Sequence, residues 1–324
     1  MTKLQQPIYN RLALIGMGLI GSSIARAARA RGAVRSIVAT ARSAKTRRRV
    51  AELGLADQVI ESNAAAVEGA DLVIVCIPVG ACAAVAKEIG PHLAAGATVS
   101  DVGSVKGSVL RDMAPHLPAN VHFVPAHPVA GTEHSGPDAG FAELFVNRWC
   151  ILTPPENADT AAIERLRSFW QALGAHVESM PADHHDLVLG ITSHLPHLIA
   201  YTIVGTADEL SEVTRSEVLK FSAGGFRDFT RIAASDPTMW RDIFLANKNA
   251  VLEMLGRFSE DLSELTRAMR SGDGQKLFDH FTRTRAIRRG IVDIGQDSPA
   301  PDFGRAHPGL PAEPLPRPYA ADNE

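Results

Sequence analysis

The glycine-rich stretch "GMGLIGSS", residues 16–23, constrains the fold of this chain more than any other feature. It directly follows an apolar run, "RLALIG", and opens a helical pattern from about Ile20 to Arg31. Gly16 would allow a tight turn, Gly18 would let a ligand approach the backbone, and Gly21 would let helix and strand pack closely. This order predicts a dinucleotide-binding βαβ unit, although a lone GxGxxG also occurs in purely structural turns.

Further apolar runs continue the alternation of strand and helix patterns through the first half of the chain. They are "SIVATA" (36–41), "DLVIVCIP" (71–78), "ATVSDVG" (97–103), "VHFVPAHP" (121–128) and "WCILTP" (149–154). Continuous Val/Ile/Leu runs between helical patterns indicate a mostly parallel sheet that is covered on both faces. We therefore predict an α/β, Rossmann-type doubly wound domain over residues 1–178.

The pattern changes near residue 178. From about Ala182 to Arg289 the periodicity is helical and no convincing strand is present, with Thr238–Arg270 expected as one long helix behind Pro237. We predict an all-helical domain over residues 179–294, of the kind that often forms a dimer core. Residues 295–324 are rich in proline and poor in apolar side chains, so this tail is expected to be disordered.

Charge, cysteine content and hydropathy indicate which partners and which cellular compartment to expect. The net charge of −3 gives no reason to expect a nucleic acid or a membrane surface as partner. The three cysteines lack metal-type spacing and are too few for a disulfide framework, which favours buried thiols in a reducing compartment. No apolar run approaches the roughly eighteen residues of a membrane helix, and the first ten residues lack a signal-peptide core. A cytoplasmic protein is the default expectation.

The cofactor is expected to contact the glycine turn and the ends of neighbouring strands. The predicted residues are Gly16, Gly18, Leu19, Ile20, Gly21, Thr40, Arg42, Ser43, Cys76 and Pro78. The stretch "IVATARS" (37–43) lacks the acid that usually binds the adenosine ribose. Arg42 and Ser43 would instead suit a 2′-phosphate, so NADP is expected to be tolerated or preferred. The alternative is that Arg42 points into water, as we expect for the basic run "TRRR" (46–49).

Polar residues that can carry chemistry follow the later strands. His127 lies at the predicted carboxyl edge of the sheet, where a neutral imidazole could take a proton from a substrate hydroxyl. Ser104 and Lys106 in "DVGSVKG" reach the same edge and could orient or polarise a substrate. Each of the three could equally be an ordinary polar loop residue.

The helical half holds histidine and arginine clusters. His194 and His197 in "TSHLPHL", and the run "DHHD" (183–186), lack the spacing of known zinc sites, so no metal is expected. Arg227 and Arg231 are four residues apart, and either could hold a substrate carboxylate or form a structural ion pair with Asp228. The chain contains neither a GxSxG nucleophile elbow nor a GxxxxGK[ST] phosphate loop.

Five motifs in this order resemble one family. They are "GMGLIGSS", "DVGSVK", "HPVAGTEHSGP", "TSHLPH" and "GGFRDFTRIAASDPTMW", and they are similar to the prephenate/arogenate dehydrogenases of tyrosine biosynthesis, especially the bacterial cyclohexadienyl dehydrogenases. The resemblance covers residues from about 10 to 290. It implies NAD(P)-dependent oxidative decarboxylation of prephenate to 4-hydroxyphenylpyruvate, or of arogenate to tyrosine, by a homodimer joined through the helical domain.

The resemblance also implies roles for individual residues. His127 matches the catalytic histidine on the ring hydroxyl, Ser104 matches a serine that holds it, and Lys106 is a weaker match. Arg231 matches the arginine that binds a substrate carboxylate. The other implied substrate-site residues are His197, His194, Glu133, Asp228, Trp240 and Gly224. The resemblance makes tyrosine a possible feedback ligand, and it leaves the choice between prephenate and arogenate open.

Two alternatives stay open at this point. Another two-domain NAD(P)-dependent dehydrogenase, of the hydroxyacid or ketopantoate reductase type, would share the glycine turn but not "HPVAG" together with "SHLPH". A non-catalytic nucleotide-sensing protein would have no need to keep His127, Ser104, Lys106 and Arg231 together.

Overall fold

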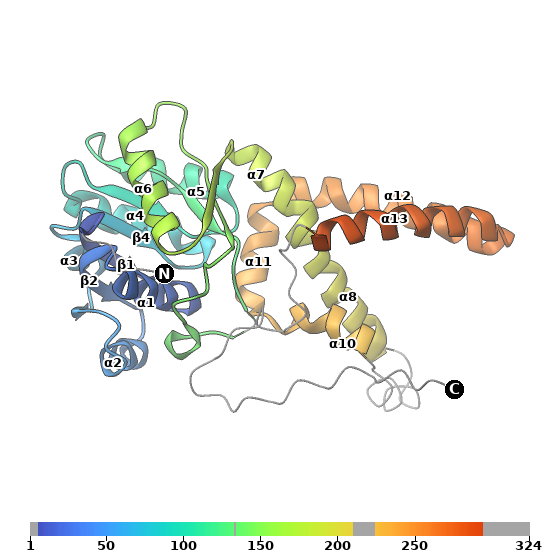
Figure 1. Cartoon of the computed structure of the whole chain (residues 1–324), viewed down its shortest axis with the longest axis horizontal. Coiled ribbons are helices and arrows are strands. Elements are labelled where there is room, and N and C mark those ends of the chain that lie inside the picture. Colours follow the sequence, from blue (N-terminus) through green and yellow to red (C-terminus); the bar gives the residue numbers. More distant parts are fainter. Residues whose placement is uncertain (1–5, 133, 210–223, 294–324) are drawn as a thin grey trace.

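The computed structural model describes residues 6–132, 134–209 and 224–293 (Figure 1). Its N-terminal part is a sheet covered by helices, and its C-terminal part is helical in the described residues, with α12 and α13 extending away from the sheet (Figure 1). The predicted tail at 295–324 and Glu133 lie outside the described residues.

The main sheet has six parallel strands in the order β3-β2-β1-β4-β5-β6. Its strands are β1 (Tyr9–Ile15), β2 (Val34–Thr40), β3 (Gln58–Ile60), β4 (Leu72–Val75), β5 (Thr98–Asp101) and β6 (His122–Phe123). The helices between and after them are α1 (Leu19–Arg31), α2 (Ala44–Glu52), α3 (Asn63–Val67), α4 (Cys82–Ile89), α5 (Lys106–Met113) and α6 (Thr160–Ala172). This strand order is that of a doubly wound dinucleotide-binding fold, which confirms the predicted fold class.

Each face of this sheet has its own apolar core, as the unbroken apolar runs predicted. On β1, Leu12 and Leu14 pack in one core with residues of α1 and α6, including Trp170. Ala13 and Ile15 pack in the other core with residues of α4 and α5. Successive strand residues point to opposite faces, so a strand buried on both sides reads as continuous rather than alternating apolar sequence.

A second, three-stranded sheet was not anticipated. The predicted run at 121–128 divides into β6 and β7 (Ala126–Pro128), and β7 pairs antiparallel with β8 (Trp149–Leu152). A short strand, β9 (His176–Ser179), pairs parallel with β8 on its other side. The chain leaves the parallel sheet at Pro125, whose carbonyl accepts a hydrogen bond from Thr153 N at 2.9 Å. His127 therefore lies in the second sheet.

The helical part begins after Ser179. Its elements are α7 (Ala182–Leu189), the π-helical turn η5 (Gly190–His194), α8 (Leu195–Glu209), α10 (Gly224–Thr230), η6 (Arg231–Ala234), α11 (Pro237–Ala246), α12 (Lys248–Ser271) and α13 (Gly274–Asp293). The expectation of one helix over Thr238–Arg270 is wrong, because the helix breaks at Asn247. The Asn247 amide donates to the carbonyl of Asp186 at 2.8 Å and lies 3.0 Å from His194 Nδ1, and these bonds hold the break.

The widened turn η5 has a local cause. Pro196 has no N–H, so the regular hydrogen bond to the carbonyl four residues earlier cannot form there. The helix instead widens just before this proline, and π-helical turns of this kind often occur at functional sites. The Nδ1 of His197 donates to the carbonyl of Ser193 at 2.8 Å, which fixes the imidazole beside the turn.

The continuous helical stretch Ala182–Glu209 is long and apolar enough to span a membrane by length and composition, with 28% of its most apolar window buried. This corrects the expectation that no apolar run approaches such a length, because the polar residues are too few to lower the average. Core helices of soluble proteins pass the same test, so a single stretch of this kind only weakly indicates a membrane span.

Candidate functional site

The glycine turn between β1 and α1 fits a bound dinucleotide. Gly16 has φ +97°, and a Cβ on it would collide with the carbonyl of Cys76. A Cβ on Gly21 would collide with the carbonyl of Gly16, so α1 can approach the strand only because both are glycines. Gly18 begins α1 without a side-chain cap and has no atom within 4 Å of a Cβ position. The open space and the first-turn N–H groups suit a pyrophosphate.

The other predicted cofactor residues stand around this turn. Leu19 and Ile20 form the partly exposed first turn of α1, and Cys76 and Pro78 follow the end of β4. A nicotinamide cofactor therefore has a backbone cradle with the strand ends beside it, although the contacts of each residue with the cofactor stay predictions.

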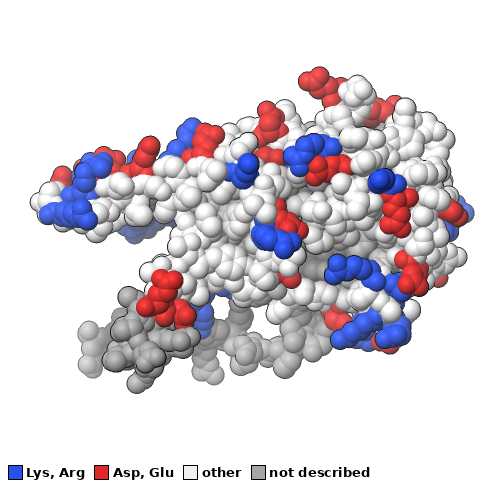
Figure 2. Space-filling view, turned by 180° about the vertical axis from the view of Figure 1, so that it is seen from behind, with Lys and Arg blue, Asp and Glu red and all other residues white. Residues whose placement is uncertain are grey.

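The corner beyond β2 is basic. Arg42 and Ser43 are exposed, and Ser43 Oγ caps α2 by accepting from Thr46 N at 3.0 Å. Arg47 is already engaged, because it donates to the carbonyl of Arg42 at 3.1 Å and pairs with Glu61 at 2.7 Å. Lys and Arg side chains gather on the part of the surface that carries α2 (Figure 2). The guanidinium of Arg42 has no polar partner among the described residues.

The hydroxyl group of Thr40 is not available to a ligand at this corner. Its side chain is fully buried, and its Oγ1 donates to the carbonyl of Glu61 at 3.2 Å. The predicted contact of Thr40 with the cofactor is therefore limited in this structure to its backbone.

Three buried side chains form a continuous hydrogen-bonded row beside the second sheet. His127 Nδ1 lies 2.8 Å from His185 Nε2, and His185 Nδ1 lies 2.8 Å from Asp186 Oδ1. His127 comes from β7, whereas His185 and Asp186 come from α7 in the helical part. The row therefore joins the two halves of the protein, and His127 Nε2 has no hydrogen-bond partner among the described residues.

The imidazole of His127 is neutral at ordinary pH. Burial lowers its pKa well below 6.5, and the neighbouring charges of His185, Lys106 and His194 lower it further. The pKa of His185 is also lowered by burial, although its hydrogen bond to Asp186 acts in the opposite direction. A neutral imidazole with one unpartnered nitrogen can accept a proton.

Lys106 does not reach a substrate position, which corrects its predicted role. Its side chain is fully buried, and its Nζ donates to Asp101 Oδ2 at 2.5 Å and to the carbonyl of Ala126 at 2.7 Å. Asp101 also accepts from the backbone N–H groups of Gly103 and Ala126. This ion pair holds the end of β5 against β7 through the backbone of Ala126, the residue before His127. Lys106 therefore stabilises the strand that carries His127 and does not touch a ligand.

Ser104 is partly exposed in the loop between β5 and α5. The resemblance implied that Ser104 holds the catalytic histidine, but in the described residues the partner of His127 is His185 and Ser104 makes no hydrogen bond to it. The next residue, Val105, is fully buried and packs with Trp240. The two residues that follow Ser104 thus contact the two groups, because Val105 packs with Trp240 and the backbone N–H of Lys106 donates to Asp186.

The second group lies where α8, η6 and α11 meet. His197 stacks on Trp240 with ring centroids 3.6 Å apart and an interplanar angle of 23°. Burial lowers the pKa of His197 to about 4, and the positive charge of Arg231 contributes to this lowering. Tyr201 OH donates to the carbonyl of Ser235 at 2.7 Å, which fixes α8 against the η6 segment. His197 is therefore neutral, with its Nε2 available as an acceptor and the charge of Arg231 nearby.

Three other predicted residues, His194, Asp228 and Gly224, show no geometry that favours substrate contact in the described part of the chain. His194 is fully buried, its Nδ1 lies against the Asn247 amide, and burial lowers its pKa to about 4. It connects the widened turn to α12, so it is a structural residue in this conformation. Asp228 is exposed and pairs with its neighbour Arg227 at 3.5 Å, and Gly224 lies beside it at the start of α10. The predicted ionic network includes Glu133, which lies outside the described residues.

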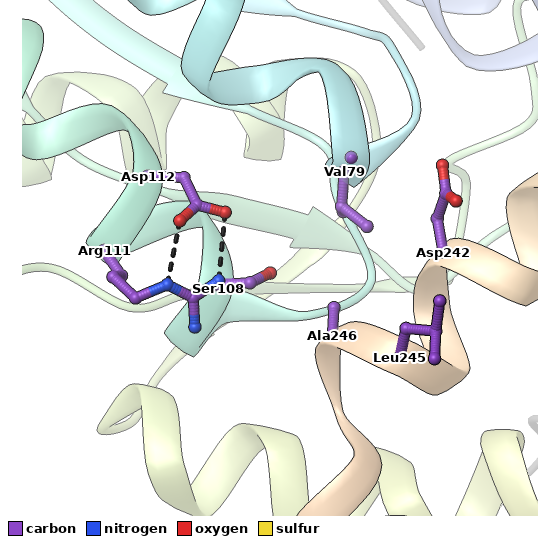
Figure 3. A pocket seen from close by; sticks show the side chains of 8 residues that line it. Val79, Ser108, Arg111, Asp112, Asp242, Leu245 and Ala246 are labelled. Carbon is purple, nitrogen blue, oxygen red and sulfur yellow. Dashed lines mark hydrogen bonds and ion pairs between the residues drawn. The ribbon is translucent and has the colours of Figure 1, made fainter.

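A shallow cavity of about 280 Å³ shares no residue with the predicted site (Figure 3). It lies between α5, α11 and the short turn η1 (Val79–Ala81), and its lining includes Arg111, Asp112, Asp242 and Leu245. Arg111 pairs with Asp112 at 2.8 Å. The cavity is a gap in the seam between the two halves, and its charged side chains are already paired with neighbours.

Sequence reasoning missed the roles of His185 and Asp186. Their run "DHHD" was considered only as a possible metal site, and the described residues contain no group of three or more His, Cys, Asp or Glu side chains that could hold a metal ion. The available signal was their place near the start of α7, which begins behind Pro181 and is the first helix after the sheet, where the two halves must meet.

Two sequence profiles match most of the chain. The one described as "Prephenate dehydrogenase, nucleotide-binding domain" matches residues 24–179, and "Prephenate dehydrogenase, dimerization domain" matches residues 181–283. A cyclohexadienyl dehydrogenase from Zymomonas mobilis subsp. mobilis is 42% identical over 281 residues, which cover 87% of this chain and 96% of the relative. A prephenate dehydrogenase from Bacillus subtilis is 33% identical over 302 residues, covering 93% of this chain and 81% of the relative.

Solved structures of prephenate and arogenate dehydrogenases are also similar to this chain. Prephenate dehydrogenase from A. aeolicus, in complex with hydroxyphenyl propionate and NAD⁺, superposes with a TM-score of 0.81 at 33% identity, covering 87% of this chain and 98% of that one. Arogenate dehydrogenase from Synechocystis superposes with a TM-score of 0.74 at 26% identity, covering 87% of this chain and 99% of that one.

Proposed function

The chain belongs to the prephenate dehydrogenase family and is a prephenate or arogenate dehydrogenase, and we propose that His127 is the base of its reaction. The observation that carries this proposal is the His127 imidazole, whose Nδ1 is 2.8 Å from His185 Nε2 while its Nε2 has no hydrogen-bond partner among the described residues. The comparisons favour this activity over a hydroxyacid dehydrogenase or ketopantoate-type reductase.

The chemistry fits a neutral base. A bound nicotinamide supplies the hydride acceptor, and the hydride leaves the hydroxyl-bearing ring carbon of the substrate. His127 Nε2 accepts the hydroxyl proton as the C–O double bond forms. The bond to the ring carboxylate on the opposite carbon then breaks, its electron pair makes the ring aromatic, and carbon dioxide leaves. His127 returns its proton to the phenolate oxygen, so the protein has only to position and polarise.

Arg231 is proposed to hold a substrate carboxylate, with His197 beside it. The support is their proximity: the Arg231 charge lowers the pKa of His197, and Trp240 holds the His197 ring by stacking. A guanidinium forms two parallel hydrogen bonds with a carboxylate, which fixes the far end of the substrate while His127 acts on the hydroxyl.

Replacing Arg231 with alanine should raise KM for prephenate about 10- to 150-fold, because hydrogen bonds to charged groups contribute about 1.5–3 kcal/mol. kcat should change less, since the hydroxyl end is unaffected. Steady-state kinetics at 340 nm measures both. Arg227→Ala is the matched control, because Arg227 is exposed and pairs with Asp228. Equal effects in the two variants would remove the carboxylate role from Arg231.

NADP use is proposed to depend on Arg42. The support is that the Arg42 side chain is exposed without a polar partner in the described part of the chain, whereas Arg47 already pairs with Glu61 in the same corner. Ser43 lies at the start of α2, where the helix N-terminus adds positive potential for a 2′-phosphate.

The Arg42→Asp variant should lower kcat/KM for NADP about tenfold or more and leave kcat/KM for NAD nearly unchanged. The added carboxylate repels a 2′-phosphate but can bind a ribose hydroxyl. Titrations with each cofactor at saturating substrate give the two constants. The control is Arg48→Asp, an equal charge change at an exposed position on α2. A parallel loss for both cofactors would mean that Arg42 only points into water.

A homodimer is proposed through the helical part. The support is the arm of α12 and α13 (Figure 1), whose exposed apolar side chains include Phe258, Leu262, Phe278, Phe281 and Ile287. Such side chains rarely stay in water as one patch. A dimer contact would also cover the exposed apolar side chains of Ala182–Glu209, so that no membrane is needed to cover them. The molar mass in solution tests this.

Two further proposals concern setting and regulation. We propose a reducing, cytoplasmic location, supported by three free cysteines, of which burial raises the pKa of Cys82 to about 12.

Tyrosine carries the ring hydroxyl and a carboxylate, so it could occupy the positions served by His127 and Arg231 as a feedback ligand. Inhibition that is competitive with prephenate would test this.

A further inference from the structure

The carboxylate of Asp186 is fixed by the start of α5. Its Oδ1 accepts from the backbone N–H of Lys106 at 2.8 Å, and its Oδ2 accepts from that of Gly107 at 2.9 Å. A helix N-terminus favours an anion, so the helical part places its carboxylate on a site that the nucleotide-binding part provides. A Cβ on Gly107 would approach Asp186 Oδ2 to 2.9 Å, which leaves little room for another residue there.

This fixed carboxylate determines the direction of every hydrogen bond in the row. An ionised carboxylate can only accept, so His185 must donate from Nδ1. The neutral His185 ring then has its lone pair on Nε2, and it can only accept from His127 Nδ1. His127 is left with its lone pair on Nε2, the nitrogen that has no partner among the described residues.

We propose that His185 and Asp186 are positioning residues that hold His127 in the tautomer with a basic Nε2. The proposal rests on the proposed role of His127 as the base, and it adds that the orientation of the base is set across the seam between the two halves. Without the row, the Nδ1 of His127 would have no acceptor in the described part of the chain that selects this tautomer.

The row also places the carboxylate of Asp186 behind His185, although the interaction with His185 itself lowers the pKa of His127. When Nε2 accepts a proton, the charge appears in a buried site that already contains Lys106, and an isolated buried cation is costly. The charged or titratable groups that act on His127 and His185 are Lys106, Asp101, Asp186 and His194. Lys106 is paired with Asp101, so Asp186 is the carboxylate that faces the histidine pair through His185.

The tautomer can be measured without activity. In the full-length protein labelled with ¹⁵N-histidine, long-range ¹H–¹⁵N correlation spectra distinguish protonated from unprotonated ring nitrogens, and the His127→Asn spectrum assigns the His127 signals. We expect Nδ1 of His127 to be protonated and Nε2 to be unprotonated at pH 7.5. A His127 ring protonated on Nε2 instead would overturn the proposal, whatever the enzyme's turnover.

Kinetics of two His185 variants test the consequence. His185→Leu removes the acceptor, and we expect kcat to fall about 10- to 100-fold, less than the effect of a general base itself, with KM nearly constant. His185→Gln places an amide oxygen near the position of Nε2, where it can accept from His127, so it should recover a large part of kcat. His184→Leu is the matched control, because His184 is exposed on the same helix.

Outcomes of the two experiments separate the proposals. Equal losses in the leucine and glutamine variants, with the native tautomer kept in both, would reduce His185 to a structural residue and overturn the inference. The expected tautomer together with full activity of His127→Asn would instead remove the base role while the inferred positioning of the ring stands.

Discussion

Replacing His127 with asparagine should lower kcat about 10²- to 10⁴-fold, the usual contribution of general acid–base catalysis. The asparagine amide can still donate to His185 from near the position of Nδ1, so the row and the fold should persist. It has no group that can accept the hydroxyl proton as Nε2 does. KM for prephenate should therefore change little, because the carboxylate end of the substrate binds elsewhere.

The pH dependence gives a second measure of the same residue. The base must be unprotonated, and burial lowers the pKa of His127 well below 6.5. The native enzyme should therefore keep full kcat/KM down to below pH 6.5 and lose it only as the pH falls through this lowered pKa. In His127→Asn the remaining kcat/KM should not fall as the pH drops through this pKa. Rate measurements between about pH 4.5 and about pH 8 would show the difference.

A His127→Asn variant with native kcat would remove His127 from the reaction. The His122→Asn variant serves as a control for general effects of losing an imidazole, since His122 is a partly buried residue of β6 outside the row. Circular dichroism of all variants shows whether the fold is kept.

Replacing Lys106 with methionine should lower the free energy of unfolding by about 3–5 kcal/mol, which is the usual cost of removing one partner of a buried ion pair. The methionine fills a similar volume but cannot pair with Asp101 or donate to the carbonyl of Ala126. An uncompensated carboxylate and an unpaired carbonyl would then remain in the interior. Urea unfolding curves measure the change.

The matched control is Lys276→Met, which removes an exposed lysine paired with Glu264 at 2.6 Å. Pairs in water contribute little, so its unfolding curve should nearly coincide with the native one. If Lys106→Met kept native stability but lost turnover, Lys106 would act on the substrate after all, and its assignment to the interior support of His127 would be wrong.

The fold was predictable because its signals are local. The glycines at 16, 18 and 21 and the continuous apolar runs each report on the backbone and burial of their own segment. The break at Asn247 was not predictable, since it depends on a carbonyl and an imidazole that come from another helix. The split of the run at 121–128 likewise depends on pairing with β8.

For the candidate functional site, the sequence allowed only the types of residue at the carboxyl edge of the sheet to be predicted. The position of His127 after an apolar run indicated a polar residue near the ligand, and the order of five motifs indicated the family. The same reasoning could not separate Lys106, which is fully buried, from Ser104, which is partly exposed two residues before it. Burial of a lysine depends on whether a carboxylate meets it in space, and Asp101 does so here.

The contact of Asp186 with the first turn of α5 limits how this enzyme can be divided or recombined. A chimera that joined residues 1–180 to a foreign helical domain would keep the whole nucleotide cradle and the histidine itself. With the positioning proposed above, it would hold that histidine in the same tautomer only if the donor domain also carried a histidine followed by an acid near the matching start of its first helix. For protein engineering, a junction beyond residue 186 is therefore preferable to one at the boundary of the folded sheet.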